Sequence, residues 1–386
     1  MEVPSQAIVG KERARHAYSK RPDEGDDIAI VPDSVRRLGG RTLLLTPDQV
    51  VSVFRALLER DPESETAIED HVALGGLEQV IGEVSNSVEY LARTRPGPLW
   101  NYAASFDPVE TVYAHENHER QPIAGHRVNY LGVAVNVDRF FPTLELENSV
   151  EDVPVPANWH TDVAELAAAL RAVENAGDDF SMVELGCGWG CWMNITAAAA
   201  RRAGKKPFVI GVEGDEGHVA FAHEALATNG VPTTSYRIFR GVAAGRTGAA
   251  FFPRQEQSGG DWGLEPVLGP SDEQAATLRE SGRYDELPMI PLSEIIGDRP
   301  RLDLLHIDIQ GGETALIRES LELLDAKVAY IVVGTHSRVI DGEIIALLER
   351  NGGWALEIER PCIHELEDGA PITVVDGVQG WRNKRF

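Results

Sequence analysis

Three glycines at alternate positions, in the stretch ELGCGWG, are the strongest chemical signal in the sequence. They are Gly186, Gly188 and Gly190, and a strand-like apolar run reaches Glu184 just before them. Because glycine has no Cβ atom, such a turn lets a ligand lie flat against the main chain. The turn therefore predicts a ligand site at the end of a strand. Trp189, between the second and third glycines, is expected to wall off this ligand or to stack on a substrate ring.

The spacing of the glycines separates the possible nucleotide-like ligands. A dinucleotide-binding turn reads G-x-G-x-x-G, and here Cys191 stands where that pattern has its third glycine. No G-K-[ST] follows, which excludes a P-loop. The E-x-G-x-G-x-G pattern is typical of class I methyltransferases that use S-adenosylmethionine, so this molecule is the expected cofactor. A nicotinamide-dependent oxidoreductase is the weaker alternative.

Two further carboxylates are expected beside this turn. Glu213 ends the next predicted strand, where it can accept both hydroxyls of an adenosine ribose, as in enzymes that bind NAD. The alternative for Glu213 is an acid that caps a helix start near Asp215. Asp308 ends a buried strand, LDLLHID, and an acid at such a strand end favours a role in the cofactor pocket or in catalysis.

A histidine is the expected proton acceptor. His336 follows the buried strand YIVVGT, which places it well for a general base, with Asp308 orienting it or the substrate. Glu313 opens the next helix after Asp308 and either interacts with the helix dipole or takes part in the site. His306 is expected to be buried and hydrogen-bonded. No metal-ligand cluster is readable, but a divalent cation bound by Asp308 and other oxygen or imidazole ligands is the alternative to the histidine base.

Other residues that could do chemistry are assigned structural roles. His115 and His118 lie three positions apart and could ligate a metal on a helix, but we expect a solvated or substrate-facing loop. Cys187 and Cys191 are interpreted as small packing residues rather than a redox pair. With Cys362 they are the three cysteines of the chain, which form no disulfide framework and no zinc-type spacing. A reducing cytoplasm is the expected location.

The elements that must position these residues alternate between strand and helix from about residue 181. Predicted strands cover 181–186, 207–213, 234–243, 302–309, 327–334, 354–360 and 371–375, and predicted helices cover 190–203, 216–229, 313–324 and 340–350. This alternation, with continuous apolar strands, predicts an α/β fold with a doubly wound, mostly parallel, seven-stranded sheet. Ligands bind beyond the carboxyl ends of the strands in such sheets, which is where the glycine turn falls.

Composition changes divide the whole chain into four predicted segments. They are a flexible tail (1–44), a small helical module for docking or packing (45–93), a linker and substrate-side cap (94–155) and the catalytic domain (156–386). The segment 111–142 and the irregular segment 253–288 are expected to cover the pocket and to set specificity, because loops beyond strand ends do so. The final WRNKRF is interpreted as a basic tail.

The net charge of the chain disfavours some classes of binding partner. The 386 residues include 61 acidic and 36 basic ones, for a net charge of −25. A nucleic acid is disfavoured, because neutralising its phosphates requires a basic surface. No apolar run reaches the ~20 residues of a membrane-spanning helix, and the first residues lack the apolar core of a signal peptide. The expected partners are a small acceptor and, through the helical module, another protein or a second copy of the chain.

Four segments together resemble the FkbM-type methyltransferase family over roughly residues 180–360: VELGCGWG, GVEG, LLHIDIQGGE and VVGTHS. The aspartate-x-x-glycine-x-glutamate pattern of that family matches Asp308, Gly311 and Glu313. The helical stretch before residue 94 resembles, more loosely, modules that precede glycan-modifying FkbM-type domains. The resemblance implies an O-methyltransferase that uses S-adenosylmethionine and acts on sugar hydroxyls of glycans, lipopolysaccharide or glycosylated natural products.

The family's functional residues can be carried over position by position. The resemblance implies a cofactor turn formed by Glu184, Gly186, Gly188 and Gly190, with a ribose contact at Glu213. It places Asp308 and His336 beside the reactive methyl group. Trp189 departs from the small or polar residue that is frequent at its position. A catalytically idle protein that binds S-adenosylmethionine and docks through its helical module is a further alternative.

Overall fold

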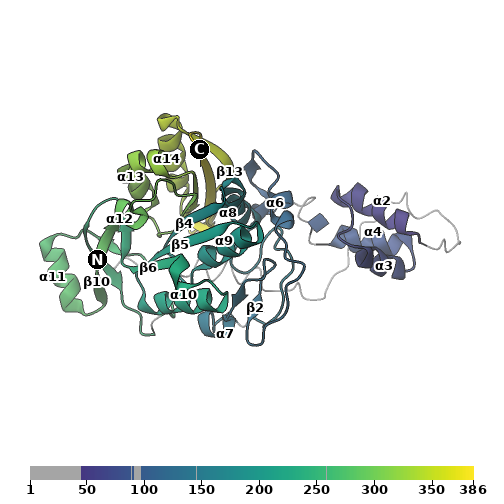
Figure 1. Ribbon diagram of the computed structural model, residues 1–386, viewed down its shortest axis with the longest axis horizontal. Coiled ribbons are helices and arrows are strands. Elements are labelled where there is room, and N and C mark those ends of the chain that lie inside the picture. The colour runs from purple at the N-terminus through teal and green to yellow at the C-terminus, as the bar shows by residue number, and fades with distance from the viewer. Residues whose placement is uncertain (1–44, 88, 91–96, 145, 258) are drawn as a thin grey trace. The chain divides into compact units, whose positions relative to one another are not determined.

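The computed structural model describes residues 45–386 except 88, 91–96, 145 and 258, so the predicted tail 1–44 lies outside the described residues. Residues 102–386 form one compact unit, and the described residues between 45 and 101 belong to a second unit. Figure 1 labels many of the helices and strands.

Three short helices make up most of the described part of the N-terminal unit: α2 (Pro47–Leu58), α3 (Glu65–Ala73) and α4 (Leu77–Asn86). Helix α2 begins with a capping box, in which the Thr46 hydroxyl accepts from the Gln49 amide while the Gln49 side chain accepts from the Thr46 amide. Apolar side chains of α2 and α4 form a common core of Val50, Val53, Phe54, Leu58, Val80 and Val84. A 3-10 turn, η2 (Pro98–Trp100), follows.

The main unit is built on an eight-stranded sheet with the order β1-β13-β16-β12-β11-β4-β5-β6. The strands are β1 (Ala103–Ala104), β4 (Asp179–Leu185), β5 (Lys206–Glu213), β6 (Tyr236–Arg240), β11 (Leu304–Ile307), β12 (Tyr330–Thr335), β13 (Trp354–Arg360) and β16 (Gly377–Asn383). Strands β12, β11, β4, β5 and β6 pair in parallel. Strand β16 runs antiparallel to both of its neighbours, and the two-residue β1 adds an eighth strand to the seven that the sequence predicts.

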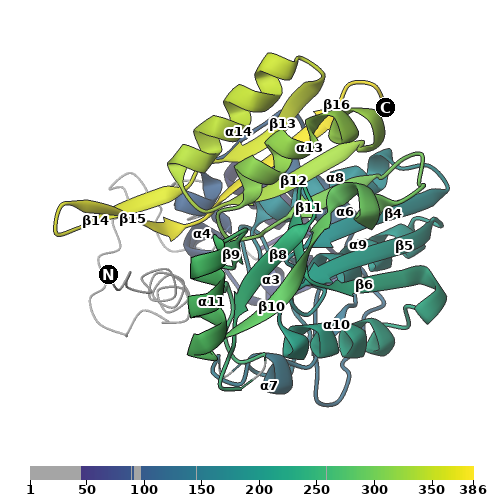
Figure 2. The ribbon, with the colours of Figure 1, turned by 90° about the vertical axis from the view of Figure 1, so that its left-hand side faces the viewer.

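The strand that completes the sheet lies later than predicted. The predicted strand 371–375 belongs to β15 (Ala370–Val375), which pairs with β14 (Ile363–Glu367) in a separate hairpin that projects from the sheet in Figure 2. The residues interpreted as a basic tail instead begin inside β16, where Trp381 is buried. Arg382 is half-buried and donates to Glu357 on the neighbouring strand, so its charge does not mark a solvated end. The tail prediction was therefore wrong.

Helices cover both faces of this sheet (Figure 2). Helices α8 (Val163–Asn175), α9 (Cys191–Arg202) and α10 (Glu216–Thr228) cover one face, and α12 (Leu292–Ile296), α13 (Glu313–Lys327) and α14 (Arg338–Asn351) cover the other. Consecutive residues of β4 show the alternation, because Met182 packs with the first set and Val183 with the second. The doubly wound, mostly parallel arrangement agrees with the prediction.

A second, four-stranded sheet lies beyond β6 and has the order β7-β10-β8-β9. Its strands are β7 (Val242–Ala244), β8 (Gly248–Pro253), β9 (Val267–Leu268) and β10 (Tyr284–Pro291), with α11 (Asp272–Ser281) beside them. The predicted strand 234–243 thus breaks at Gly241, where a Cβ atom would come within 2.6 Å of the Ile290 side chain. The segment 253–288 is less irregular than predicted, and the Ser271–Gln274 capping box of α11 was a readable signal for it.

Short elements precede the sheet: α6 (Pro108–Ala114), β2 (Arg127–Val128), β3 (Ala134–Val135) and α7 (Val137–Phe140), and the 3-10 turn η3 (Thr233–Ser235) precedes β6. Across the part of the chain that the structure describes, no helix combines the length and the apolar character needed to cross a membrane.

Candidate active site

A pocket of about 230 Å³ opens at the carboxyl ends of β4, β5 and β11. Its lining comes from the glycine turn, the strand ends and the loops that surround them: Phe141, Trp159, His160, Glu165, Glu184, Gly186–Gly188, Trp189, Cys191, Trp192, Val212–Gly214, His218, Gly241–Ala243, Phe252, Trp262–Leu264, Pro266, His306 and Asp308–Gln310. Both segments that were expected to cover the pocket, 111–142 and 253–288, contribute to this lining. Their role in specificity stays a prediction.

The glycine turn adopts the backbone that only glycine takes readily. Gly186, Gly188 and Gly190 have φ angles of 74°, 52° and 75°. A Cβ atom at Gly186 would collide with the carbonyl oxygen of Asp308, and one at Gly188 would stand 2.7 Å from the ring of Trp262. The first glycine therefore lets the ends of β4 and β11 meet, and the second lets an aromatic ring lie on the turn.

Glu184 has a structural role as well as a place in the pocket. Its two carboxyl oxygens accept from the amides of Trp192 (3.2 Å) and Met193 (2.9 Å) in the first turn of α9. The residue at the N-cap of that helix, Gly190, has no side chain to do this. Burial raises the pKa of Glu184 well above its usual range, the two amides lower it, and the charge of Asp308 raises it again.

Glu213 faces the pocket at the end of β5. It accepts from the amide of Gly188 at 2.9 Å and from the amide of Asp215 at 2.8 Å. Helix α10 is capped by Asp215, whose side chain accepts from the amide of His218. Because a carboxylate offers about four lone-pair positions, Glu213 keeps positions for ribose hydroxyls.

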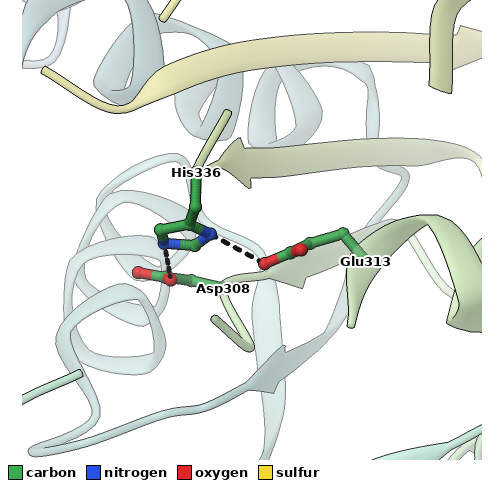
Figure 3. A group of neighbouring side chains, drawn as sticks. All are labelled: Asp308, Glu313 and His336. Atoms are coloured by element: carbon green, nitrogen blue, oxygen red, sulfur yellow. Dashed lines mark hydrogen bonds and ion pairs between the residues drawn. The ribbon is translucent and has the colours of Figure 1, made fainter. Parts of the chain in front are cut away.

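Asp308, Glu313 and His336 meet at the ends of β11 and β12 and the start of α13 (Figure 3). The His336 ring lies between the two carboxylates, with Nε2 at 3.0 Å from Asp308 Oδ1 and Nδ1 at 2.9 Å from Glu313 Oε1. The side chains are 41%, 0% and 14% exposed for Asp308, Glu313 and His336 respectively. Of the three, only Asp308 lines the pocket.

His336 is a cation in this arrangement. Burial by itself lowers the pKa of His336, but the hydrogen bonds to Asp308 and Glu313 and the charges of Asp308 and Asp376 raise it to about 10. A pKa in this range favours a doubly protonated ring at neutral pH, in which each ring nitrogen donates to a carboxylate. The ring therefore has no nitrogen with which to accept a substrate proton, which argues against the predicted general base at His336. Glu313 accepts a hydrogen bond from His336, so its role is more than an interaction with the dipole of α13.

The same three residues are the only group of metal-ligating side chains that lie close together in the described part of the chain, with ligand atoms within 4.8 Å of one another. Two carboxylates and an imidazole are suitable donors for a divalent cation. Each ring nitrogen, however, already faces a different carboxylate, so an ion would have to displace a ring proton. A protonated ring would already place a positive charge between these two carboxylates.

His115 and His118 do not form a metal pair. Helix α6 ends at Ala114, before both, so the helical spacing is not met. His115 lies 3.4 Å from a Glu174 oxygen and His118 lies 3.7 Å from a Glu116 oxygen, and the His118 side chain is 80% exposed. The expectation of a loop is confirmed.

The cysteines and the tryptophan of the glycine turn are packing residues. Burial raises the pKa values of the Cys187 and Cys191 thiols well above their usual range, which favours the neutral, less nucleophilic form of each. Trp189 is buried and packs near Phe140, with ring centroids 6.3 Å apart. It also lines the pocket, and the expectation that it walls off a ligand or stacks on a substrate ring stays a prediction.

Several pocket residues were not anticipated from the sequence. Trp262 stacks on His218 at 3.9 Å and on Phe141 at 4.7 Å between ring centroids. The glycines that flank Trp262, in GGDWG, were the available signal. Gln310 lies 3.0 Å from both Asp308 and His336 and has a left-handed φ of 57°, a strained backbone that is common at functional sites.

His306 is buried and hydrogen-bonded, as predicted, but it also lines the pocket. Its Nε2 lies 3.0 Å from an oxygen of Glu165, at the start of α8. Its ring stacks on Trp192 at 4.8 Å. No local pattern points to Glu165, because it lies 141 positions before its partner.

The sequence is similar to proteins of one family. A family model described as the methyltransferase FkbM domain matches residues 172–353. A protein of Jannaschia sp. (strain CCS1) named "Putative methyltransferase" is 38% identical over 270 residues, which cover 69% of this chain and 96% of that protein. The methyltransferase FkbM structure from Methylobacillus flagellatus KT aligns with a TM-score of 0.36 and 10% identity, over 86% of this chain and 58% of that chain. The precorrin-6y C5,15-methyltransferase structure from Geobacter metallireducens GS-15 aligns with a TM-score of 0.31 and 11% identity, over 57% of this chain and 87% of that chain.

Proposed function

The chain belongs to the FkbM-domain methyltransferase family, and from that premise we propose that it transfers the methyl group of S-adenosylmethionine to a sugar hydroxyl of a glycan or a glycosylated natural product. The observation that carries this proposal is the glycine turn, which lies beside the Glu213 carboxylate in a pocket bordered by Asp308. A nucleoside-binding turn and a pocket-facing carboxylate are the two parts that methyl transfer to a hydroxyl requires.

The residues of the pocket fit the cofactor. The three glycines leave the turn without Cβ atoms, and Glu213 retains lone pairs for the two ribose hydroxyls. Glu184 holds the start of α9 in place under the turn. Trp189 and Trp262 offer aromatic walls for the bound molecule. When bound, S-adenosylmethionine supplies an electrophilic methyl group on a sulfonium.

Asp308 is the residue that we assign to the acceptor proton. The acceptor oxygen forms its bond to the methyl carbon as the carbon–sulfur bond breaks and the sulfur takes the electron pair, while the hydroxyl proton passes to the carboxylate. A weak base is sufficient, because the hydroxyl becomes strongly acidic as the new bond forms. His336 is a positioning residue, whose charged ring fixes the Asp308 carboxylate and balances its charge.

A divalent cation is the second candidate for activating the hydroxyl, favoured by the proximity of the ligand atoms of Asp308, Glu313 and His336. The two mechanisms differ in their response to a chelator. With a charged His336, activity survives treatment with EDTA. Loss of activity on EDTA treatment that is reversed by Mg²⁺ or Mn²⁺ would favour the cation instead.

Calorimetry tests the cofactor. We expect S-adenosylmethionine and S-adenosylhomocysteine to bind and NAD to fail. Tight binding of NAD without S-adenosylmethionine would favour the nicotinamide-dependent oxidoreductase.

Mass spectrometry tests the reaction. Glycans from cells with and without the protein should differ by one methylene unit for each methyl group added. Binding of S-adenosylmethionine without any methylated product would favour the catalytically idle docking protein.

A further inference from the structure

Three carboxyl side chains converge on the pocket where the reaction is proposed to occur. Asp308 ends β11, Glu184 lies at the end of β4, and Glu165 stands in the first turn of α8. All three line the pocket. They come from three separate elements, so their meeting is a property of the fold and not of one acidic stretch of sequence.

Burial and neighbouring carboxylates disfavour ionisation of two of these groups, Glu165 and Glu184. Burial raises the pKa of Glu165, its hydrogen bond to His306 lowers it, and the charges of Asp162 and Asp308 raise it again. The charges of Asp308 and Glu165 also raise the pKa of Glu184. In each case a nearby cation would favour ionisation and a further anion would oppose it.

The side chains that line the described pocket include neither lysine nor arginine. Arg360, a buried cation near the start of α8, is bonded to Asp162 at 2.7 Å and is outside the lining. The charged ring of His336 is shared between Asp308 and Glu313, so that group as a whole stays negative.

The buried imidazole of His306 is a second, independent observation that points to a ligand in this pocket. His306 lines the pocket and is 1% exposed, yet its Nδ1 has no hydrogen-bond partner among the described residues. The side chains of Trp192 and Trp159 line the same pocket, and Trp192 stacks on the His306 ring. Aromatic faces attract cations and also cover the C–H faces of sugar rings.

We propose that this end of the pocket selects its ligands by charge. It favours a cationic cofactor over its neutral product, and it accepts sugars that are neutral or carry an amino group beside the methylated hydroxyl. It rejects sugars that carry a phosphate or carboxylate beside the methylated hydroxyl. Neither lysine nor arginine lines the pocket to neutralise a further negative charge in this region of low dielectric. The inference rests on the proposed function and names the substrate class for it.

The first arm of the test measures how the charge of the cofactor affects its binding, in the absence of any acceptor. S-adenosylmethionine carries one more positive charge than S-adenosylhomocysteine. The ratio of their Kd values therefore measures how strongly the pocket favours a positively charged ligand. We expect calorimetry to give tighter binding of S-adenosylmethionine to the wild type, and Glu165→Gln to reduce that preference roughly three- to tenfold. The control, Glu174→Gln, lies on the same helix at an exposed position and should leave the ratio unchanged.

The second arm measures formation of S-adenosylhomocysteine with matched acceptors: methyl β-galactoside, galactosamine, galactose 6-phosphate and galacturonate. Turnover of the first two and not of the last two is expected. A preference for either anionic sugar, or a Kd ratio that Glu165→Gln leaves unchanged, overturns the inference while the proposed function stands. If neither cofactor form binds, the proposed function fails and the inference falls with it. If none of the four sugars is turned over, the proposed selection among sugars is overturned, and the Kd ratio tests the cofactor preference alone.

Discussion

Replacing Glu313 with glutamine tests how much the negative charge of Glu313 contributes to the raised pKa of His336. The Glu313 side chain is fully buried, and its Oε1 accepts from His336 Nδ1 at 2.9 Å and from the Gly311 amide at 3.1 Å. Glutamine has nearly the same shape, and its carbonyl oxygen can accept both bonds. The substitution therefore removes a charge and keeps the contacts.

The size of the effect follows from the pKa of His336. A value of about 10, against an ordinary value of 6.5, corresponds to on the order of 5 kcal/mol in favour of the charged ring. Two carboxylates provide this preference against the cost of burial. A hydrogen bond to a charged group contributes roughly 1.5–3 kcal/mol, so losing the Glu313 charge should lower the pKa of His336 by about 1 to 2, into the range of about 8 to 9.

Nuclear magnetic resonance of the ¹⁵N-labelled imidazole measures this pKa directly. The wild-type ring should stay doubly protonated through neutral pH and titrate near pH 10, while Glu313→Gln should titrate at a lower pH. Glu322→Gln, at an exposed position of the same helix, is the matched control. A wild-type ring that titrates near 6.5, or an unchanged pKa in Glu313→Gln, would refute the assignment of His336 as a bridging cation.

The same pKa gives the protein a pH dependence of stability. The folded-state pKa of His336 is raised above the unfolded value, so its stabilising contribution is fully present below about pH 6.5 and is lost as the pH rises towards 10. Urea unfolding should therefore give a lower free energy of unfolding at pH 10 than at pH 7. In Glu313→Gln the loss should be smaller and should end at a lower pH.

Three further substitutions test the glycine turn, the aromatic side chain of Trp262 in the pocket and the proposed proton acceptor. Gly186→Ala should lower the free energy of unfolding by more than ~3 kcal/mol in urea, while Gly204→Ala, with a similar φ of 75° and open space around it, should cost only about 1 kcal/mol. Trp262→Ala should weaken binding of S-adenosylmethionine roughly tenfold in calorimetry without changing the fold. Asp308→Asn should lower kcat by about 10²-fold or more while the Kd of the cofactor changes little, and wild-type turnover in this variant would exclude Asp308 as the proton acceptor.

The features that the sequence predicts well are those that local patterns determine. A parallel strand followed by a helix places its last residues at one edge of the sheet, so the sequence alone predicts that Gly186, Glu213 and Asp308 share a pocket. The glycine spacing is likewise local, and all three φ angles are positive, as the turn requires.

The features that the sequence did not predict depend on contacts between distant segments. Strand β16 enters the sheet antiparallel between β12 and β13, and its basic end resembles a solvated tail until Arg382 is seen to bond with Glu357. Trp262 reaches the glycine turn from an insertion between strands of the second sheet. Neither placement follows from periodicity, because both are fixed by partners far along the chain.

His336 shows why a residue's position does not decide its chemistry. Its place after a buried strand is typical of a general base, and an imidazole with one carboxylate partner would serve as one. The second carboxylate, Glu313, comes from the start of a helix where a dipole interaction alone would explain its presence. With both partners the charged form of the ring is favoured, and we propose that Asp308, which lines the pocket, is the proton acceptor. The protonation state of the pair therefore depends on a contact between β12 and α13 that neither segment reveals by itself.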